Sequence, residues 1–454
     1  MEEPIEKTEE KQYKEKQPRQ TAHTMLAVII PALMLGGFVL FALLSRRTNL
    51  MELALAALSV IFFAVLTLLM LPKFLAFFKP ERMRSPSQKL GERSIKRLHP
   101  IFQIIIWAII AQIIAYAVVF IADGVMNGVS GTVIAAYPRL FIASGGLEFG
   151  ENTRTLIGSL GALSFVLPQH LERIISGPAY LIPIFIINML VICGDSLLLY
   201  ELLLHDYDKR SSKFAVSLLL ASPTMLLLLQ PLSGVSLFLA LSLGSLLFAR
   251  KKRPLPAGLC ALLACAVNLL AVLLFVPILM EGLRGCVIYS AKTADKGREK
   301  TSSLIAGTVI GALLPLLAGG AAVFFHIRTG KGIPAFFEQP RYFFEPLGRL
   351  ADSLTEASAF GKLLLPALAI IAFAVLAFIA CRRMRSSFAV FSLIWLAIAP
   401  SVLPVSLTVF TVFSFTLLPA AESSVFSRRY LRALYTFVIA AITVLFIFFA
   451  FVRQ

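Results

Sequence analysis

The chain alternates between long apolar runs and short polar or basic segments. Most of the apolar runs have at least roughly 17 residues, which is close to the length that spans a bilayer as a helix at about 1.5 Å per residue. Eleven such runs are predicted as transmembrane helices: residues 25–45, 51–71, 101–122, 180–204, 214–230, 232–249, 303–325, 363–380, 389–402, 405–418 and 434–452. The pattern therefore predicts an all-α polytopic membrane protein with about 11 spans.

One further apolar run, residues 256–280, has basic residues on both sides. Arg250 and Arg253 precede it, and Lys296 follows it. A single crossing would place one of these basic groups outside, against the positive-inside rule. Asn268 is the strongly polar residue inside the run, so we expect the chain to turn back there as a re-entrant pair of half-helices. Non-helical backbone at that depth needs protein or a wet cavity around it, which implies an internal cavity.

The polar segments define the predicted organisation. Their basic residues favour a cytoplasmic N-terminus, because cytoplasmic loops carry the excess of Lys and Arg. The expected order is a disordered tail at 1–23, a transmembrane hairpin at 24–78, a basic cytoplasmic loop at 79–100, and a membrane domain at 101–454 with external loops at 123–178 and 326–362. Within the first external loop, two apolar pieces at 133–143 and 156–168 are too short to span and are expected as interfacial helices.

Charge and cysteine content limit the function classes. The net charge of +17 comes from 42 basic and 25 acidic residues, and membrane topology explains this excess without nucleic-acid binding, for which no module is present. The five cysteines form no CxxC pair, and His170 has no second histidine at ligand spacing, so no metal site is predicted. No phosphate-binding loop, dinucleotide fingerprint or Ser-His-Asp arrangement occurs, and no cofactor is predicted.

A resemblance to a known family lies between residues 181 and 284. Its elements are Ser222-Pro223, the run SLFLALSLG at 236–244, the basic turn Arg250–Arg253, and an AGL sequence at 257–259. In this order they resemble the PIG-V-like mannosyltransferases, membrane glycosyltransferases of the GT-C class. The polar motifs of that family are degenerate in this chain.

Two positions illustrate this degeneracy. The family's acidic position falls on Ala135 in one alignment frame, or on Asp123 in another. The arginine at its re-entrant tip is replaced by Asn268.

The resemblance implies a GT-C-like fold and the transfer of mannose or another hexose. The donor would be a polyprenyl-phosphate-linked sugar, and the acceptor a lipid or glycan of the cell envelope at the outer face of a bacterial-type cytoplasmic membrane. Such a reaction needs a carboxylate to accept the hydroxyl proton and cations near the departing phosphate. Asp123 is the first candidate for the base and Glu148 and Glu151 are alternatives, while Arg154 and Arg173 are candidates for phosphate binding.

Simpler roles stand beside these assignments. Asp123 could mark only the membrane boundary, Glu148 and Glu151 could be solvated loop charges, and the arginines could anchor lipid head groups. Asp195 lies inside an apolar run, where an acidic residue indicates either a functional site or a polar pair with Asn188 or Asn268. Two other functions therefore stay open: a catalytically inactive relative that binds membrane lipid or a partner, and a lipid or solute transporter lined by intramembrane charges.

Overall fold

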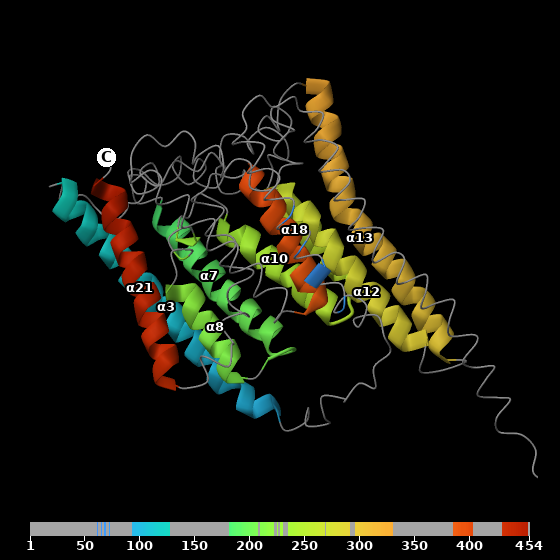
Figure 1. The fold of residues 1–454 in the computed structure, drawn as a ribbon, viewed down its shortest axis with the longest axis horizontal. Coiled ribbons are helices and arrows are strands. Elements are labelled where there is room, and N and C mark those ends of the chain that lie inside the picture. Colours follow the sequence, from blue (N-terminus) through green and yellow to red (C-terminus); the bar gives the residue numbers. More distant parts are fainter. Residues whose placement is uncertain are drawn as a thin grey trace, which may run out of the picture.

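The described part of the chain is entirely helical. The computed structural model describes residues 93–127, 181–207, 209–221, 235–267, 269–290, 296–329, 385–402 and 429–452, together with positions 61, 65, 68, 69, 72, 225, 228 and 229. These residues contain helices and no strand (Figure 1). The helices are α3 (Arg93–Asn127), α7 (Leu181–Leu203), α8 (Lys209–Ala221), α10 (Val235–Arg250), α11 (Pro254–Val267), η2 (Leu269–Leu274), α12 (Phe275–Ser290), α13 (Lys296–Thr329), α18 (Ser386–Val402) and α21 (Arg429–Val452).

Four segments of these helices are long and apolar enough to cross a membrane. They are Pro100–Val119, Ile186–Leu203, Leu270–Val287 and Ser302–Ala321. Their outward surfaces suit lipid: on α3, for example, Phe102 and Ile113 are exposed. The all-helical fold and the membrane character that the sequence predicted are therefore confirmed for the described residues. The predicted number of 11 spans depends on segments outside them, including residues 25–45, 363–380 and 405–418.

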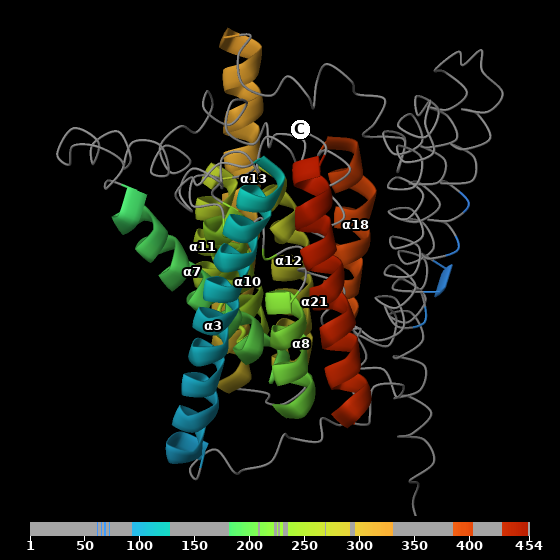
Figure 2. The ribbon, with the colours of Figure 1, turned by 90° about the vertical axis from the view of Figure 1, so that its left-hand side faces the viewer.

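The helices run side by side, and polar contacts fix their relative directions (Figure 2). Ser236 of α10 bonds Asn188 near the start of α7, and Arg250 at the end of α10 bonds Asp206 just after α7. α7 and α10 therefore run in the same direction. α8 runs the opposite way and packs against α7, α3 and α21. α21 runs parallel to α8, because Arg432 lies over the Phe214 ring while Thr443 donates a hydrogen bond to the carbonyl oxygen of Ala221.

Residues 254–290 form a helical hairpin, made of α11, η2 and α12. The chain leaves the turn at Lys252 and comes back to it, since a Cβ on Gly285 of α12 would lie 3.9 Å from the Lys252 side chain. Both ends of residues 254–290 therefore lie at the same end of the bundle. The re-entrant pair of half-helices stays a prediction, because Leu270–Val287 is itself long and apolar enough to cross a membrane. Asn268, where the turn was expected, lies between α11 and η2 and outside the described residues.

Helix α13 packs along both arms of this hairpin through small residues. Gly311 of α13 meets Gly258 and the Pro254 carbonyl of α11, while Thr308 of α13 fills the space beside Gly282 of α12. Nearer the tip, Gly319 faces Val272 of η2. Close helix packing of this kind needs small side chains, which lets the backbones approach.

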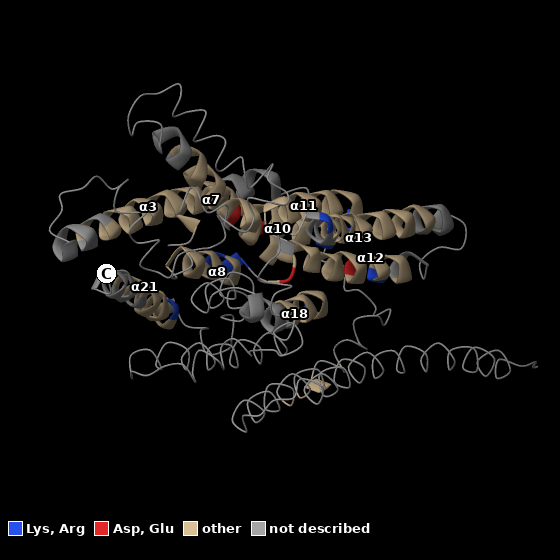
Figure 3. Ribbon diagram, turned by 90° about the horizontal axis from the view of Figure 1, so that it is seen from above, with Lys and Arg blue, Asp and Glu red and all other residues tan. Residues whose placement is uncertain are grey.

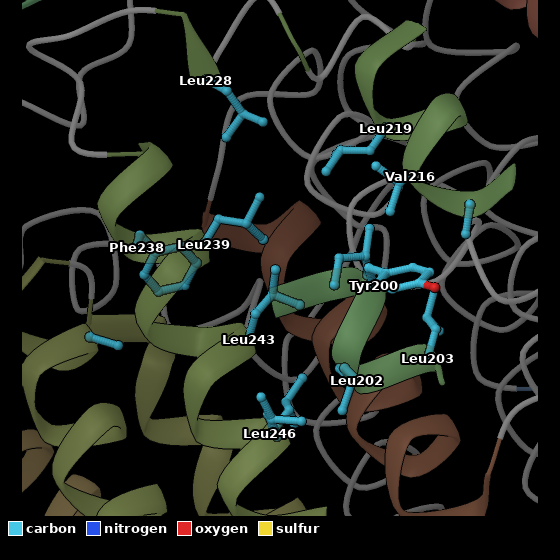
Figure 4. Close-up of a cluster of buried hydrophobic side chains, with 14 of the residues drawn as sticks. Tyr200, Leu202, Leu203, Val216, Leu219, Leu228, Phe238, Leu239, Leu243 and Leu246 are labelled. Atoms are coloured by element: carbon cyan, nitrogen blue, oxygen red, sulfur yellow. The ribbon is translucent and has the colours of Figure 1, made fainter. Parts of the chain in front are cut away.

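The apolar core runs through the bundle, with buried residues from α3, α7, α8, α10, α11, η2, α12, α13, α18 and α21. Tyr200 of α7 and Leu243 of α10 are almost completely buried and belong to one cluster, drawn in Figure 4. On the other side of α10, Phe238 stacks on Trp395 of α18 with ring centroids 5.9 Å apart. These contacts place α10 at the centre of the described helices.

Two helices extend further than their apolar runs predicted. α3 begins at Arg93, inside the predicted loop at 79–100, and ends at Asn127, inside the predicted external loop at 123–178. α13 likewise ends at Thr329, inside the predicted loop at 326–362. The apolar run marks only the part of a helix that suits the bilayer interior, because backbone hydrogen bonding continues into polar residues where water is available.

Candidate functional site

One end of the bundle gathers basic residues, and we call it the basic end. It is defined by Asp206, Arg250, Lys252, Arg284 and Arg385. Arg250 bonds Asp206 at 2.7 Å, and Nη1 of Arg385 lies 3.6 Å from the same carboxylate. Figure 3 shows Lys and Arg in blue near α8, α12 and α21. Arg328, near the end of α13, lies far from this cluster at the opposite end.

A buried ion pair ties three elements together at the basic end. Glu281 of α12 is 3% exposed. Its two carboxylate oxygens accept hydrogen bonds from Nε and Nη2 of Arg385, the latter at 2.9 Å, and the Ser387 hydroxyl also donates to it. Since Arg385 also contacts Asp206, the start of α18 joins the hairpin arm α12 to the turn after α7.

The Glu281–Arg385 pair was not predicted from the sequence. Arg385 was expected only as a cytoplasmic marker, and Glu281 directly follows the predicted half-helix at 256–280. The two residues are separated by 104 positions, so no local pattern connects them. The sequence did offer one signal: Glu281 is an acidic residue next to a long apolar run, and an acidic residue inside an apolar run is what singled out Asp195.

His205 lies beside this cluster, just after α7. Burial lowers the pKa of its imidazole, and the positive charges of Arg250 and Lys251 lower it further, while Asp206 and Glu201 act in the opposite direction. The net effect favours the neutral ring. A second proton would add positive charge to an end that already carries several arginines.

A second polar region lies deeper, where α3, α7 and α10 meet. Asn188 accepts a hydrogen bond from the Ser236 hydroxyl at 2.6 Å and donates one to the Leu228 carbonyl at 2.8 Å. On α3, the Tyr116 hydroxyl donates to the Leu229 carbonyl at 3.1 Å, and the Gln112 amide donates to the Met189 carbonyl at 3.4 Å. These contacts satisfy most of the buried polar atoms of these side chains, while Oε1 of Gln112 has no hydrogen-bond partner among the described residues.

Asp195 is different from these neighbours. It is 0% exposed, and neither carboxylate oxygen has a hydrogen-bond partner in the part of the chain that the structure describes. The alternative that Asp195 pairs with Asn188 is wrong, because Asn188 bonds Ser236 and Leu228 instead. Pairing with Asn268 is not seen either, and Asn268 itself lies outside the described residues.

The structure locates only one of the candidate residues for sugar transfer. Asp123 belongs to α3, four positions before its end at Asn127 and beyond the candidate span Pro100–Val119. The other candidates lie outside the described residues: Glu148, Glu151, Arg154 and Arg173. Within the described residues no group of three His, Cys, Asp or Glu side chains is placed to hold a metal ion.

Comparisons with family models, with curated proteins and with solved structures find no match to this chain. The fold class that the described helices define is that of an all-helical membrane protein.

Proposed function

We propose that this protein is a GT-C-like membrane protein that transfers a hexose, such as mannose, from a polyprenyl-phosphate donor to a lipid or cell-surface acceptor. The observation that carries the proposal is the hairpin formed by α11, η2 and α12. Its first part, up to residue 284, belongs to the stretch 181–284 that resembles the PIG-V-like family. Both ends of the hairpin lie at the basic end. A hairpin that turned back inside the bilayer would create the sheltered space that a lipid-linked substrate requires.

The basic end would face the cytoplasm. Arg250, Lys252, Arg284 and Arg385 gather there, and the positive-inside rule assigns such a concentration to the cytoplasmic side. In this orientation α3 leads away from the cytoplasm, so its end at Asn127 would lie at the outer face. The membrane would be a bacterial-type cytoplasmic membrane, with the N-terminus inside.

The chemistry would then take place at the outer end of α3. Asp123 would accept the proton of the acceptor hydroxyl as that oxygen attacks the anomeric carbon, while the bond to the donor phosphate breaks. Arg154 and Arg173 would hold the departing phosphate, since guanidinium groups bind phosphate oxygens in pairs. Glu148 and Glu151 remain alternative bases. Membrane lipids would surround the site, and no nucleic acid would take part.

A transfer assay tests this proposal. Membranes that contain the full-length protein would be incubated with polyprenyl-phosphate carrying a radiolabelled mannose, next to membranes from cells without the gene. Labelled product that depends on the protein supports the transferase. Binding of the donor without transfer would instead support the catalytically inactive relative. The degenerate motif positions Ala135 and Asn268 favour that alternative.

A further inference from the structure

Asp195 lies on the face of α7 that meets α10. Seven residues separate it from Asn188, which is nearly two full helical turns, so the two side chains share one face. Asn188 accepts a hydrogen bond from Ser236, and this contact turns the shared face toward α10. Asp195 is about 10 Å along the helix from Asn188 and about 12 Å before the end of α7 at Leu203, which Asp206 follows closely. It therefore lies between the two polar contacts that join α7 and α10.

Among the described residues, the helices packed against α7 offer no counter-charge at the level of Asp195. α10 carries no charged residue from Val235 to Ala249, and α3 carries none between Pro100 and Val119. The cations of α8, Lys209, Arg210 and Lys213, belong to its first turns near the basic end. The other titratable groups of the packed elements are Tyr116 on α3, Arg93, Lys96, Arg97 and His99 at its start, Asp123 toward its end, Arg250 at the end of α10, and Cys193, Tyr200 and Glu201 on α7 itself.

α7 itself carries no basic residue from Leu181 to Leu203. The buried face of α10 carries Leu239 and Leu243, which belong to the same apolar cluster as Tyr200 of α7 (Figure 4), and it also carries the buried Ser242 and Ser245. An ionised carboxylate without a partner is strongly disfavoured in such a low-dielectric region. The hydroxyl groups of Ser242 and Ser245 have no hydrogen-bond partner among the described residues, but they are neutral and cannot balance the charge of a carboxylate. The smallest cation that can neutralise the carboxylate is a proton.

We propose that Asp195 is a proton-binding site in the interface between α7 and α10. In the closed interface it holds the proton as a neutral carboxylic acid. Release of that proton leaves a negative charge between the two helices, so α7 and α10 must separate or admit water there. The contacts Asn188–Ser236 and Asp206–Arg250 hold the interface at its two ends. This site is independent of the proposed sugar transfer, which does not use Asp195.

The first test is infrared difference spectroscopy on the purified full-length protein in lipid nanodiscs. At neutral pH the wild-type protein should show the carbonyl band of a protonated carboxylic acid that Asp195→Asn lacks. Glu201→Gln, which changes another acid on the same helix, should keep the band. An identical spectrum for the wild-type protein and Asp195→Asn would overturn the proposal.

The second test is the pH dependence of stability. The folded protein holds a proton that the unfolded chain releases near neutral pH, so raising the pH favours unfolding. Relative to Asp195→Asn, the ratio of folded to unfolded wild-type protein should fall by up to about tenfold for each unit of pH increase. Equal slopes for the two proteins would overturn the proposal. So would a wild-type stability that depends on sodium rather than on pH, measured by replacing sodium chloride with choline chloride.

Discussion

Gly258 of α11 and Gly311 of α13 are in direct backbone contact. A Cβ added to Gly258 would lie 2.3 Å from the carbonyl oxygen of Gly311, and a Cβ added to Gly311 would lie 2.3 Å from the carbonyl oxygen of Pro254. Backbone atoms cannot move aside as the end of a side chain can. The glycine pair therefore sets how closely the hairpin arm α11 approaches α13, which matches the use of small residues between membrane helices.

This contact predicts that Gly258→Ala and Gly311→Ala each destabilise the protein. Overpacking of a tightly packed interface typically costs about 1–3 kcal/mol, because α11 and α13 must move apart. The measurement is the thermal unfolding of the purified protein in detergent. Gly194→Ala is the matched control, since nothing lies within 4 Å of a Cβ at that position of α7, and it should be neutral or slightly stabilising because alanine favours helix. Equal stability of Gly311→Ala and the wild type would contradict the described contact.

A second prediction concerns the ion pair between Glu281 and Arg385. Arg385→Met should be strongly destabilising, by about 3–5 kcal/mol, because it leaves the buried Glu281 carboxylate without its cation. The double variant Glu281→Leu/Arg385→Met should recover much of that loss, because no unpaired charge remains. Chemical or thermal unfolding of the single and double variants measures the coupling. Additive losses in the double variant would mean that the two side chains do not act as a pair.

The comparison of sequence and structure shows why this pair was missed while the helices were found. Apolar runs predicted α3, α7, α10 and α13, because a helix that crosses the bilayer needs a continuous stretch of apolar residues. The direction of the hairpin was predicted from charge on both of its flanks. By contrast, Glu281 finds Arg385 only through the packing of α12 against α18, which no local pattern encodes.

The candidate site was predicted only in part, for a related reason. Asp195 was recognised because an acidic residue inside an apolar run is rare and can be seen in the sequence alone. The alternative that it pairs with Asn188 was wrong. Asn188 bonds Ser236 and the Leu228 carbonyl instead, and these contacts depend on how α7 and α10 pack together. The end of α3 at Asn127 was also missed, because helix can continue past the apolar run that signals a span.

A third prediction tests the orientation of the bundle. Single cysteines would replace Lys251, Lys296 and Arg328 in a protein whose five native cysteines have been removed, and intact cells would be treated with an impermeant thiol reagent. We expect labelling at 328 and none at 251 or 296, because the hairpin returns to the basic end and α13 then leads away from it. Opposite labelling of 251 and 296 would refute the hairpin. The cysteine-free protein is the control.

A fourth prediction follows from the lowered pKa of His205. The unfolded chain should protonate this residue near its ordinary pKa of 6.5, whereas the folded chain resists protonation because the ring is buried near Arg250 and Lys251. Stability should therefore be lost as the pH falls below that value toward the lower pKa of the folded state. Thermal unfolding at a series of pH values should show this loss in the wild type and a weaker loss in His205→Gln. Parallel curves would show that His205 does not cause it.

The last prediction concerns Asp123 at the end of α3. If the protein transfers sugar and Asp123 is the base, Asp123→Asn should lower the rate by about 10²–10⁴, the usual contribution of general-base catalysis. The amide is nearly the same size as the carboxyl group but does not accept the acceptor's proton. Asp123 lies beyond the candidate span Pro100–Val119, so the exchange should leave the protein folded.

The assay is transfer of radiolabelled mannose from polyprenyl-phosphate by membranes matched for protein content, with the unfolding temperature of each variant as the folding control. Asp195→Asn provides a second control, because it changes a buried acid that the transfer reaction does not use, and it should retain activity. An Asp123→Asn variant as active as the wild type would exclude Asp123 as the base, and Glu148→Gln and Glu151→Gln would then be the variants to measure.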